Sequence, residues 1–186
     1  MEKRTKKKEQ DGQQESLEHQ SLEVSMLNKD SFSDEELESY LSKGAIRASD
    51  EITVPPKILF VGDCTIATFG NFSASTGKAK SKKTFNISAM VAAAVTNSTV
   101  LNYRACLPEG KRTILYFDTE QSKYHCHTVL ERIYRLSGLS LKKDDPRLMF
   151  WGLREYTPKL RIAVIDYALR KYEGVGLVII DGLRDL

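Results

Sequence analysis

A continuous apolar run at 176–181 (GLVIID) is the feature of this 186-residue chain that most constrains its fold. Strands read as unbroken apolar runs when helices cover both faces of a parallel sheet. Upstream, apolar runs at 113–118 and 148–151 alternate with helical patterns at 122–137 and from Pro158 onward. Strands that alternate with helices are typical of α/β proteins, so we predict a mostly parallel sheet with helices on both faces.

Each of the two helical patterns carries an apolar stripe, which predicts the side that faces the sheet. On the first helix the stripe is Cys126, Val129, Leu130, Ile133 and Tyr134. On the second helix the expected inner face is Leu160, Ala163, Val164, Tyr167, Ala168 and Tyr172.

Composition divides the chain into three parts. Residues 1–28 are rich in Lys, Glu and Gln and lack aromatic residues, so we predict a disordered charged tail. Residues 29–56 are expected to hold a short helix, capped by Ser33 with Glu36, and a linker that ends at two prolines. The α/β domain is assigned to residues 57–186.

The domain is expected to open with a hairpin of Ile58–Val61 and Thr65–Phe69 around a Gly-Asp turn. We predict that the second strand continues through Phe72 to Ala74 and leads into a loop. The residues from Thr84 to Thr96 are almost all apolar or small, which is typical of a buried helix.

The segment between this strand and this helix, GKAKSKKT, is close to the phosphate-loop pattern G-x-x-x-x-G-K-[ST]. Free N–H groups of such a loop and of the helix start converge on an anion. We therefore predict that ATP phosphates contact Gly77, Lys78, Ala79, Lys80, Ser81, Lys82, Lys83 and Thr84. Lys83 would reach the β- and γ-oxygens, and Thr84 would hold Mg²⁺. The alternative is a lysine-rich surface loop.

Lys82 is a departure from the pattern, because glycine usually stands at this position. Glycine is favoured there since it permits a positive φ and a close backbone approach. Lys82 must therefore adopt either a strained backbone or an ordinary helical one.

Two carboxylates follow predicted strands, at the sheet edge where ligands gather in α/β proteins. Asp181 ends the GLVIID strand, and we predict that it binds Mg²⁺; the alternative is a carboxylate that caps the turn before Gly182. Glu120 is the predicted catalytic residue, which would orient or deprotonate the attacking water. Asp118 is its competitor, and Glu120 could instead only place negative charge at the next helix start.

Taken together, GKAKSKKT at 77–84, FDTE at 117–120 and VIIDGLRDL at 178–186 resemble the RecA-like ATPase superfamily. Within it, the chain is similar to RepA-type hexameric plasmid helicases, to DnaB-like ATPases and to mobile-element ATPases of Bacteroides-type bacteria. The resemblance runs from Ile58 to the end of the chain. It implies a RecA-like P-loop NTPase core, ATP and Mg²⁺ as ligands, and a ring or filament of subunits that acts on DNA.

Members of this superfamily continue well beyond the equivalent of Asp181, whereas this chain ends at Leu186. We therefore expect a core that is incomplete at the C-terminus, with an open sheet edge and weak or absent turnover.

The leading hypothesis is an ATPase motor of a mobile genetic element, working in DNA replication or mobilisation. The rivals are a nucleotide-sensing regulatory or interaction module without turnover, and a small-molecule kinase.

Arg154 and Arg184 follow predicted strands, and Arg184 is the better candidate for a phosphate contact. The His125-Cys126-His127 triplet is not expected to bind a metal, because residues two apart on a helix point in different directions.

The net charge and the cysteine content limit which ligands and which cellular compartment we expect for this protein. The net charge of +3 gives no general argument for nucleic acid, and the three cysteines are too far apart in sequence for a cysteine zinc site. The charged start lacks an apolar signal segment, and the longest apolar stretch is too short to span a bilayer. We predict a cytoplasmic protein with no membrane partner.

Overall fold

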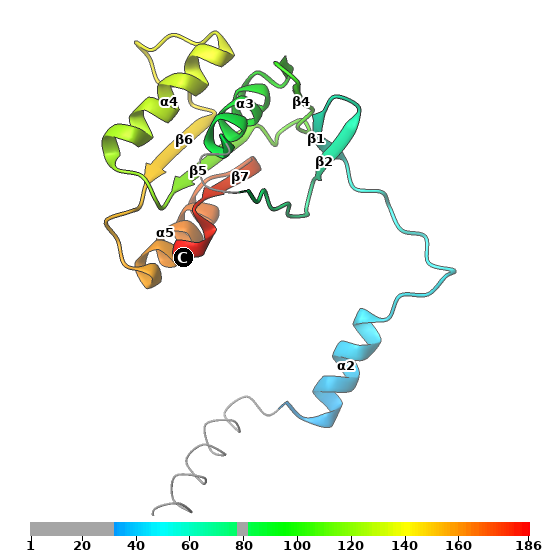
Figure 1. Ribbon diagram of the computed structural model, residues 1–186. Helices are drawn as coiled ribbons and strands as arrows, with labels where there is room; N and C mark the ends of the chain where they lie inside the picture. Colours follow the sequence, from blue (N-terminus) through cyan, green and yellow to red (C-terminus); the bar gives the residue numbers. More distant parts are fainter. Residues whose placement is uncertain (1–31, 78–81) are drawn as a thin grey trace, which may run out of the picture. The chain divides into compact units, whose positions relative to one another are not determined.

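The computed structural model describes residues 32–77 and 82–186, which belong to two units, Met1–Ile52 and Thr53–Leu186 (Figure 1). The predicted tail at 1–28 lies outside the described residues. In the first unit, helix α2 (Asp34–Gly44) begins with the predicted capping box. The Glu36 N–H donates to Ser33 Oγ at 3.2 Å, and the Ser33 N–H donates to Glu36 Oε2 at 2.8 Å.

A parallel sheet of three strands forms the centre of the second unit, in the order β6-β5-β7. These strands are β5 (Thr113–Asp118), β6 (Leu148–Gly152) and β7 (Val175–Asp181). Helices α3 and α4 cover one face and α5 covers the other, as Figure 1 shows. The predicted α/β class and the parallel pairing of these strands are therefore confirmed.

Strand β5 lies in the middle of the sheet, and its side chains fill both cores. Ile114 and Tyr116 face the α3 and α4 side, whereas Leu115 and Phe117 face α5. Each face carries one aromatic stack, with ring centroids 4.3 Å apart for Tyr116–Phe150 and 4.9 Å apart for Phe117–Trp151. Because the four β5 side chains from Ile114 to Phe117 are fully buried from solvent, this apolar run has the burial expected of a central strand.

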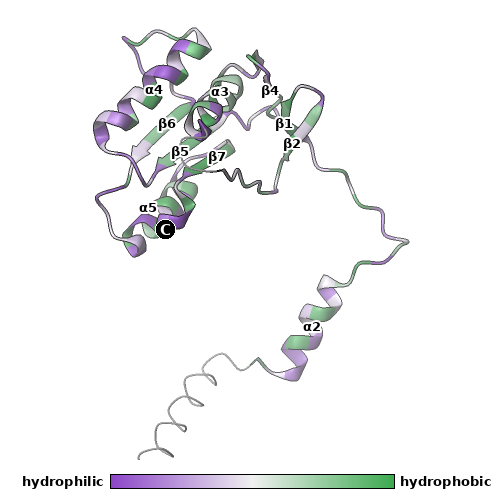
Figure 2. Ribbon diagram, in the orientation of Figure 1, coloured by the Kyte–Doolittle hydropathy of each residue, from purple (hydrophilic) through white to green (hydrophobic). Residues whose placement is uncertain are grey.

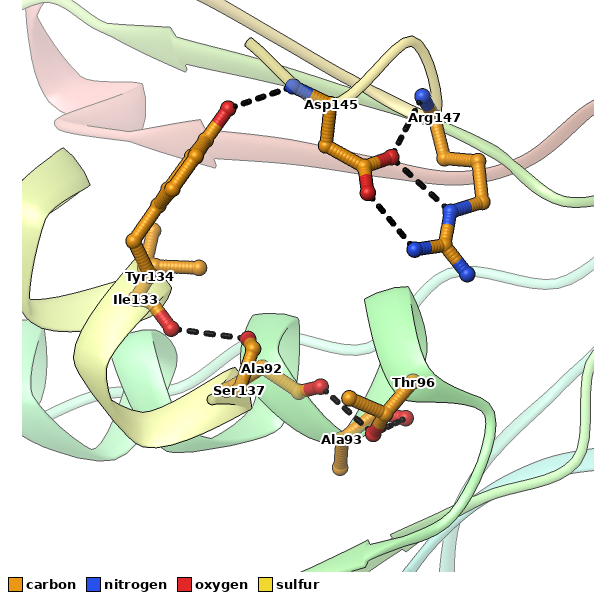
Figure 3. Close-up of polar contacts among 8 residues, drawn as sticks. All are labelled: Ala92, Ala93, Thr96, Ile133, Tyr134, Ser137, Asp145 and Arg147. Carbon is orange, nitrogen blue, oxygen red and sulfur yellow. Dashed lines mark hydrogen bonds and ion pairs between the residues drawn. The ribbon is translucent and has the colours of Figure 1, made fainter. Parts of the chain in front are cut away.

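Helix α3 (Lys83–Thr96) is the buried helix that the sequence predicts, with Ala and Val side chains packed against the sheet and α4. Helix α4 (Lys123–Ser137) buries four of the five residues of its predicted stripe, and Leu130 is half-buried. The end of α4 fixes the loop before β6, because the Asp145 N–H donates to the Tyr134 hydroxyl at 2.7 Å (Figure 3). Arg147 pairs with Asp145 in the same loop and holds the pKa of that carboxyl below its usual value.

Helix α5 (Pro158–Lys171) differs from its predicted orientation. Of the predicted inner face, Ala168 is buried and Val164 and Tyr172 are partly buried, whereas Leu160, Ala163 and Tyr167 are exposed; Ile165 is buried as well. The cause is Arg161, which lies on the inner side of the helix and donates to the carbonyl oxygens of Leu153, Arg154 and Asp185. These bonds hold the helix rotated away from the orientation that its apolar pattern predicts.

A separate antiparallel sheet has the order β2-β1-β4-β3. The predicted hairpin is confirmed as β1 (Lys57–Val61) and β2 (Cys64–Thr68). Two short strands, β3 (Thr99–Val100) and β4 (Tyr103–Ala105), complete this sheet and are not predicted by the sequence.

The predicted continuation of the second strand through Phe72 to Ala74 is wrong. Strand β2 ends at Thr68, a turn with Gly70 at φ +80° follows, and the Phe72 side chain is 95% exposed. The turn ends the ladder with β1, and residues 71–77 have no regular secondary structure.

Within residues 32–77 and 82–186, none of the helices has the length and apolar character needed to cross a membrane.

Candidate functional site

The carboxyl ends of β5 and β7 lie side by side, so Asp118 and Asp181 are register partners on adjacent strands. Thr119 fixes the turn beyond them, because its N–H donates to the Asp181 carbonyl at 3.0 Å. The Thr119 hydroxyl lies 3.1 Å from the same carbonyl oxygen and 2.7 Å from that of Gly182. This edge of the sheet is the position at which ligands gather in parallel α/β folds.

Asp181 is influenced by side chains of β5 and of the first turn of α3. The Tyr116 hydroxyl donates to Asp181 Oδ2 at 3.0 Å. Burial and the charge of Asp118 raise the pKa of Asp181, while hydrogen bonds from Tyr116 and Thr84 and the charge of Lys83 oppose the rise. Thr84 and Lys83, in the first turn of α3, therefore contribute to the electrostatic surroundings of the Asp181 carboxyl.

Lys82 caps α3 in the left-handed conformation, with φ 60° and ψ 25°. Of the two alternatives for this position, the strained backbone is the one observed. Its carbonyl accepts the N–H groups of Phe85 and Asn86 at 3.0 and 3.1 Å, which starts the helix. Because glycine adopts this conformation without strain, Lys82 keeps the backbone form that the usual glycine of a phosphate loop permits.

The two ends of the phosphate-loop segment lie close together. The Lys83 ammonium donates to the Gly77 carbonyl at 3.3 Å. The predicted contacts of Lys78, Ala79, Lys80 and Ser81 fall outside the described residues.

Asp118 and Glu120 have different surroundings, although both follow the same strand. Asp118 is fully buried, and its Oδ1 accepts the N–H groups of Glu120 at 3.0 Å and Gln121 at 2.7 Å. Its Oδ2 accepts from the Gln121 side-chain amide at 2.8 Å. Both oxygens of Asp118 thus hold the loop, whereas Glu120 is exposed and lines a cleft. Of the two candidates, Glu120 is the one placed to contact a ligand.

Two clefts are lined in part by the predicted site residues. A cleft of about 410 Å³ is lined by Lys82, Thr84, Phe85 and Arg132. A second cleft, of about 620 Å³, is lined by Thr119, Glu120, Arg154, Pro158, Arg161, Arg184, Asp185 and Leu186. The Arg184 side chain is 90% exposed and shares this cleft with Glu120, so it is available to an anion bound there.

The His-Cys-His triplet on α4 has three separate sets of contacts. His125 Nδ1 lies 2.9 Å from Ser122 Oγ, and His127 Nδ1 lies 3.7 Å from Glu131. Cys126 is buried, which raises the pKa of its thiol to about 11. Among residues 32–77 and 82–186, no group of three His, Cys, Asp or Glu side chains forms a metal-binding cluster.

Sequence reasoning did not identify Tyr116 or Arg161 as part of this region. Tyr116 lies two residues before Asp118, and the period of two along a strand places both on the same face, so this signal could have found it. Arg161 gave no such signal, because an arginine within an apolar helix pattern is usually expected at the surface.

The buried position of Asp181 predicts a pH-dependent stability. The pKa of Asp181 is raised in the folded chain, so the folded chain retains this proton to higher pH than the unfolded chain does. The free energy of unfolding therefore decreases as pH rises from the ordinary value of 3.8 through the folded pKa.

Asp181→Asn should remove this decrease and stabilise the chain more at pH 7 than at pH 4. Urea unfolding at both pH values measures the effect. Asp144→Asn, which changes an exposed carboxylate, is the control. Equal effects of Asp181→Asn at the two pH values would show that the carboxyl is not perturbed.

The fold and the site define an α/β protein with a three-stranded parallel sheet and a cluster of polar residues at its carboxyl edge. No family model, no curated protein and no solved structure matches the chain.

Proposed function

We propose that the chain is a P-loop ATPase with a RecA-like core that serves a mobile genetic element in DNA replication or mobilisation, as a helicase-like motor. The proposal is carried by the order of these elements: the start of α3 carries Lys83 and Thr84, which act on the pKa of Asp181, the last residue of β7. A phosphate-binding lysine, a hydroxyl and a strand-end carboxylate are the groups that a P-loop NTPase uses together.

The phosphates of ATP would lie at the N-terminal end of α3, where unpaired N–H groups and the helix dipole favour an anion. Lys83 would neutralise the β- and γ-phosphates. Thr84 and Asp181 supply hard oxygen donors, and Mg²⁺ is commonly held by one or two carboxylates and retained waters. When bound there, Mg²⁺ would supply positive charge to the phosphate oxygens.

Two further side chains complete the proposed chemistry. Glu120 would orient the attacking water and take its proton, from the cleft that it shares with Arg184. Arg184 would place positive charge beside the phosphates. The DNA substrate and the ring of subunits belong to the proposal on the strength of the resemblance to hexameric helicases.

The smaller cleft offers a place for the nucleoside. The Arg132 guanidinium carbon lies 6.0 Å from the centre of the Phe85 ring, and Arg132 Nη1 contacts Ser88 Oγ at 3.4 Å. Phe85 follows Thr84 directly and is 42% exposed. An aromatic face and a guanidinium plane are both surfaces on which a base can stack.

A nucleotide-sensing module without turnover is the second candidate. The left-handed backbone at Lys82 costs energy in a loop that must close around phosphates. The raised pKa of Asp181 also disfavours the ionised carboxylate that Mg²⁺ requires.

Calorimetric titration with Mg·ATP tests the proposal directly. Lys83→Ala should weaken binding by about ten- to a hundredfold, because it removes charge-assisted hydrogen bonds to the phosphates. Lys142→Ala removes an exposed lysine from a distant loop and should change nothing. Lys82→Gly should retain binding, since glycine adopts the left-handed backbone freely.

Absence of Mg·ATP binding by the unmodified chain would overturn the proposal. Binding that Lys83→Ala leaves unchanged would place the nucleotide elsewhere.

A further inference from the structure

Tyr116 is a fully buried side chain whose hydroxyl reaches the candidate site. Figure 2 shows hydrophobic residues along β5 and β6, and the Tyr116 ring stacks there on Phe150, with ring centroids 4.3 Å apart and planes 13° apart. A buried hydroxyl needs a hydrogen-bond partner within the protein, because leaving its donor unsatisfied is costly. The partner of this hydroxyl is Asp181 Oδ2, at 3.0 Å.

The strands on both sides of β5 fix the position of this bond. Tyr116 is the register partner of Phe150 on β6 and of Ile179 on β7. Asp181 follows Ile179 by two residues on the same strand, so the two side chains point to the same face of the sheet as Tyr116. Because the stacked ring is held in a close-packed core, its hydroxyl holds Asp181 Oδ2 in one place.

The two carboxylate oxygens of Asp181 therefore differ in their surroundings. Oδ2 accepts the Tyr116 hydroxyl, and the positive end of that O–H dipole opposes the approach of a cation to this oxygen. Oδ1 does not take part in the bond, and Asp181 is only partly buried. A cation at this edge of the sheet thus meets less opposition at Oδ1 than at Oδ2.

We propose that Tyr116 is a positioning residue, which makes Asp181 a metal ligand through one oxygen and so favours Mg²⁺ over Ca²⁺. The inference rests on the proposed function, which assigns Mg²⁺ to Asp181 and Thr84. Mg²⁺ demands a near-ideal octahedral arrangement at short distances and keeps several waters, so a single carboxylate oxygen suits it. Ca²⁺ takes more oxygen ligands and often binds both oxygens of one carboxylate. The bond from Tyr116 to Oδ2 opposes that two-oxygen arrangement.

The same bond also affects the protonation of Asp181. Burial raises the pKa of the carboxyl, and the hydrogen bond from Tyr116 opposes this rise. Loss of the hydroxyl would therefore weaken the binding of any divalent cation, because a carboxyl must lose its proton to bind metal. A comparison of two cations separates this effect from selection, since both cations need the ionised carboxylate.

Calorimetric titration of the full chain with ATP, in separate series with saturating Mg²⁺ and saturating Ca²⁺, tests the inference. The measured quantity is the ratio of the two dissociation constants. Tyr116→Phe keeps the stacked ring and removes the hydroxyl. It should weaken binding with Mg²⁺ by about tenfold, as is typical when the partner of a metal ligand is lost. Binding with Ca²⁺ should weaken less, so the preference for Mg²⁺ should fall.

Tyr134→Phe is the matched control. Tyr134 is also a buried tyrosine, and its hydroxyl accepts the Asp145 N–H in the loop before β6. This variant should keep the cation preference of the unmodified chain. Phe150→Leu is a second test, because it removes the stacking partner of Tyr116 and keeps the hydroxyl. Its preference for Mg²⁺ should fall by less than that of Tyr116→Phe. Urea unfolding of each variant confirms that the fold is retained.

Several results would overturn the inference alone. They are an unmodified chain that binds ATP equally well with both cations, an unchanged ratio in Tyr116→Phe, and an equal fall of the ratio in Tyr134→Phe. The last result would assign the change to a general loosening of the core. A chain that binds ATP with neither cation would instead overturn the proposed function and, with it, the role of Tyr116.

Discussion

Glu120→Gln is expected to lower ATP hydrolysis strongly while Mg·ATP binding remains. The Glu120 side chain is exposed in the cleft, and the hydrogen bonds of this loop are made by its backbone N–H to Asp118. The substitution therefore preserves the loop but removes the base that would accept a proton from water. Loss of a positioned general base lowers turnover by roughly a hundredfold or more. Phosphate release measures turnover, and calorimetry measures binding on the same samples.

Glu155→Gln is the matched control, because Glu155 is an exposed carboxylate in the loop after β6. Its turnover should equal that of the unmodified chain. If Glu120→Gln hydrolysed ATP as fast as the unmodified chain, another residue would have to orient the attacking water. An unmodified chain that binds Mg·ATP without any turnover would favour the nucleotide-sensing module.

Gly182→Ala is expected to destabilise the chain strongly, although it adds a single methyl group. Gly182 has φ +101°, and a Cβ at this position would lie 2.3 Å from Thr119 Oγ1 and 2.5 Å from Glu120 Cγ. The backbone strain and the overlap together should lower the free energy of unfolding by about 2–4 kcal/mol. Relief of the overlap would also displace Glu120, so turnover should fall even where the chain remains folded. Urea unfolding followed by circular dichroism measures the stability.

Gly138→Ala separates backbone strain from overlap. Gly138 has φ +69°, but a Cβ there would meet no atom within 4 Å. It should cost only about 1 kcal/mol, the strain of a left-handed alanine. A cost for Gly182→Ala no larger than that for Gly138→Ala would mean that Thr119 and Glu120 move aside freely.

Local sequence patterns predict the central part of the fold because burial on both faces leaves few alternatives. The apolar run of β5 and the almost entirely apolar or small residues of α3 are buried as predicted. The run of β7 also predicts burial on both faces, but β7 lies at the edge of this sheet and is mostly only partly buried. The rotation of α5 could not be predicted, because it depends on bonds from Arg161 to the carbonyl oxygens of three other residues. Strands β3 and β4 were missed because two or three residues give no detectable period.

The candidate site is likewise predictable from the sequence only in part. The strand-end positions of Asp118, Glu120 and Asp181 follow from sequence. The contrast between a buried Asp118 with both oxygens occupied and an exposed Glu120 does not, because it depends on how the loop after β5 turns. The sequence also leaves open whether the Lys82 backbone is strained or helical, and the structure has the strained form with φ 60°.

The aromatic stack on the α5 side of the sheet contains a tryptophan whose fluorescence can report on this part of the chain. Trp151 is the sole tryptophan of the 186 residues, and it is the neighbour of Phe117 and of Tyr172, whose ring centroid lies 5.6 Å away. It precedes Gly152, which pairs with Asp118 across the sheet. Its emission therefore comes from one known position, one residue from the edge where ligand would bind. A shift of emission maximum on ligand addition would register movement at that edge, without any attached dye.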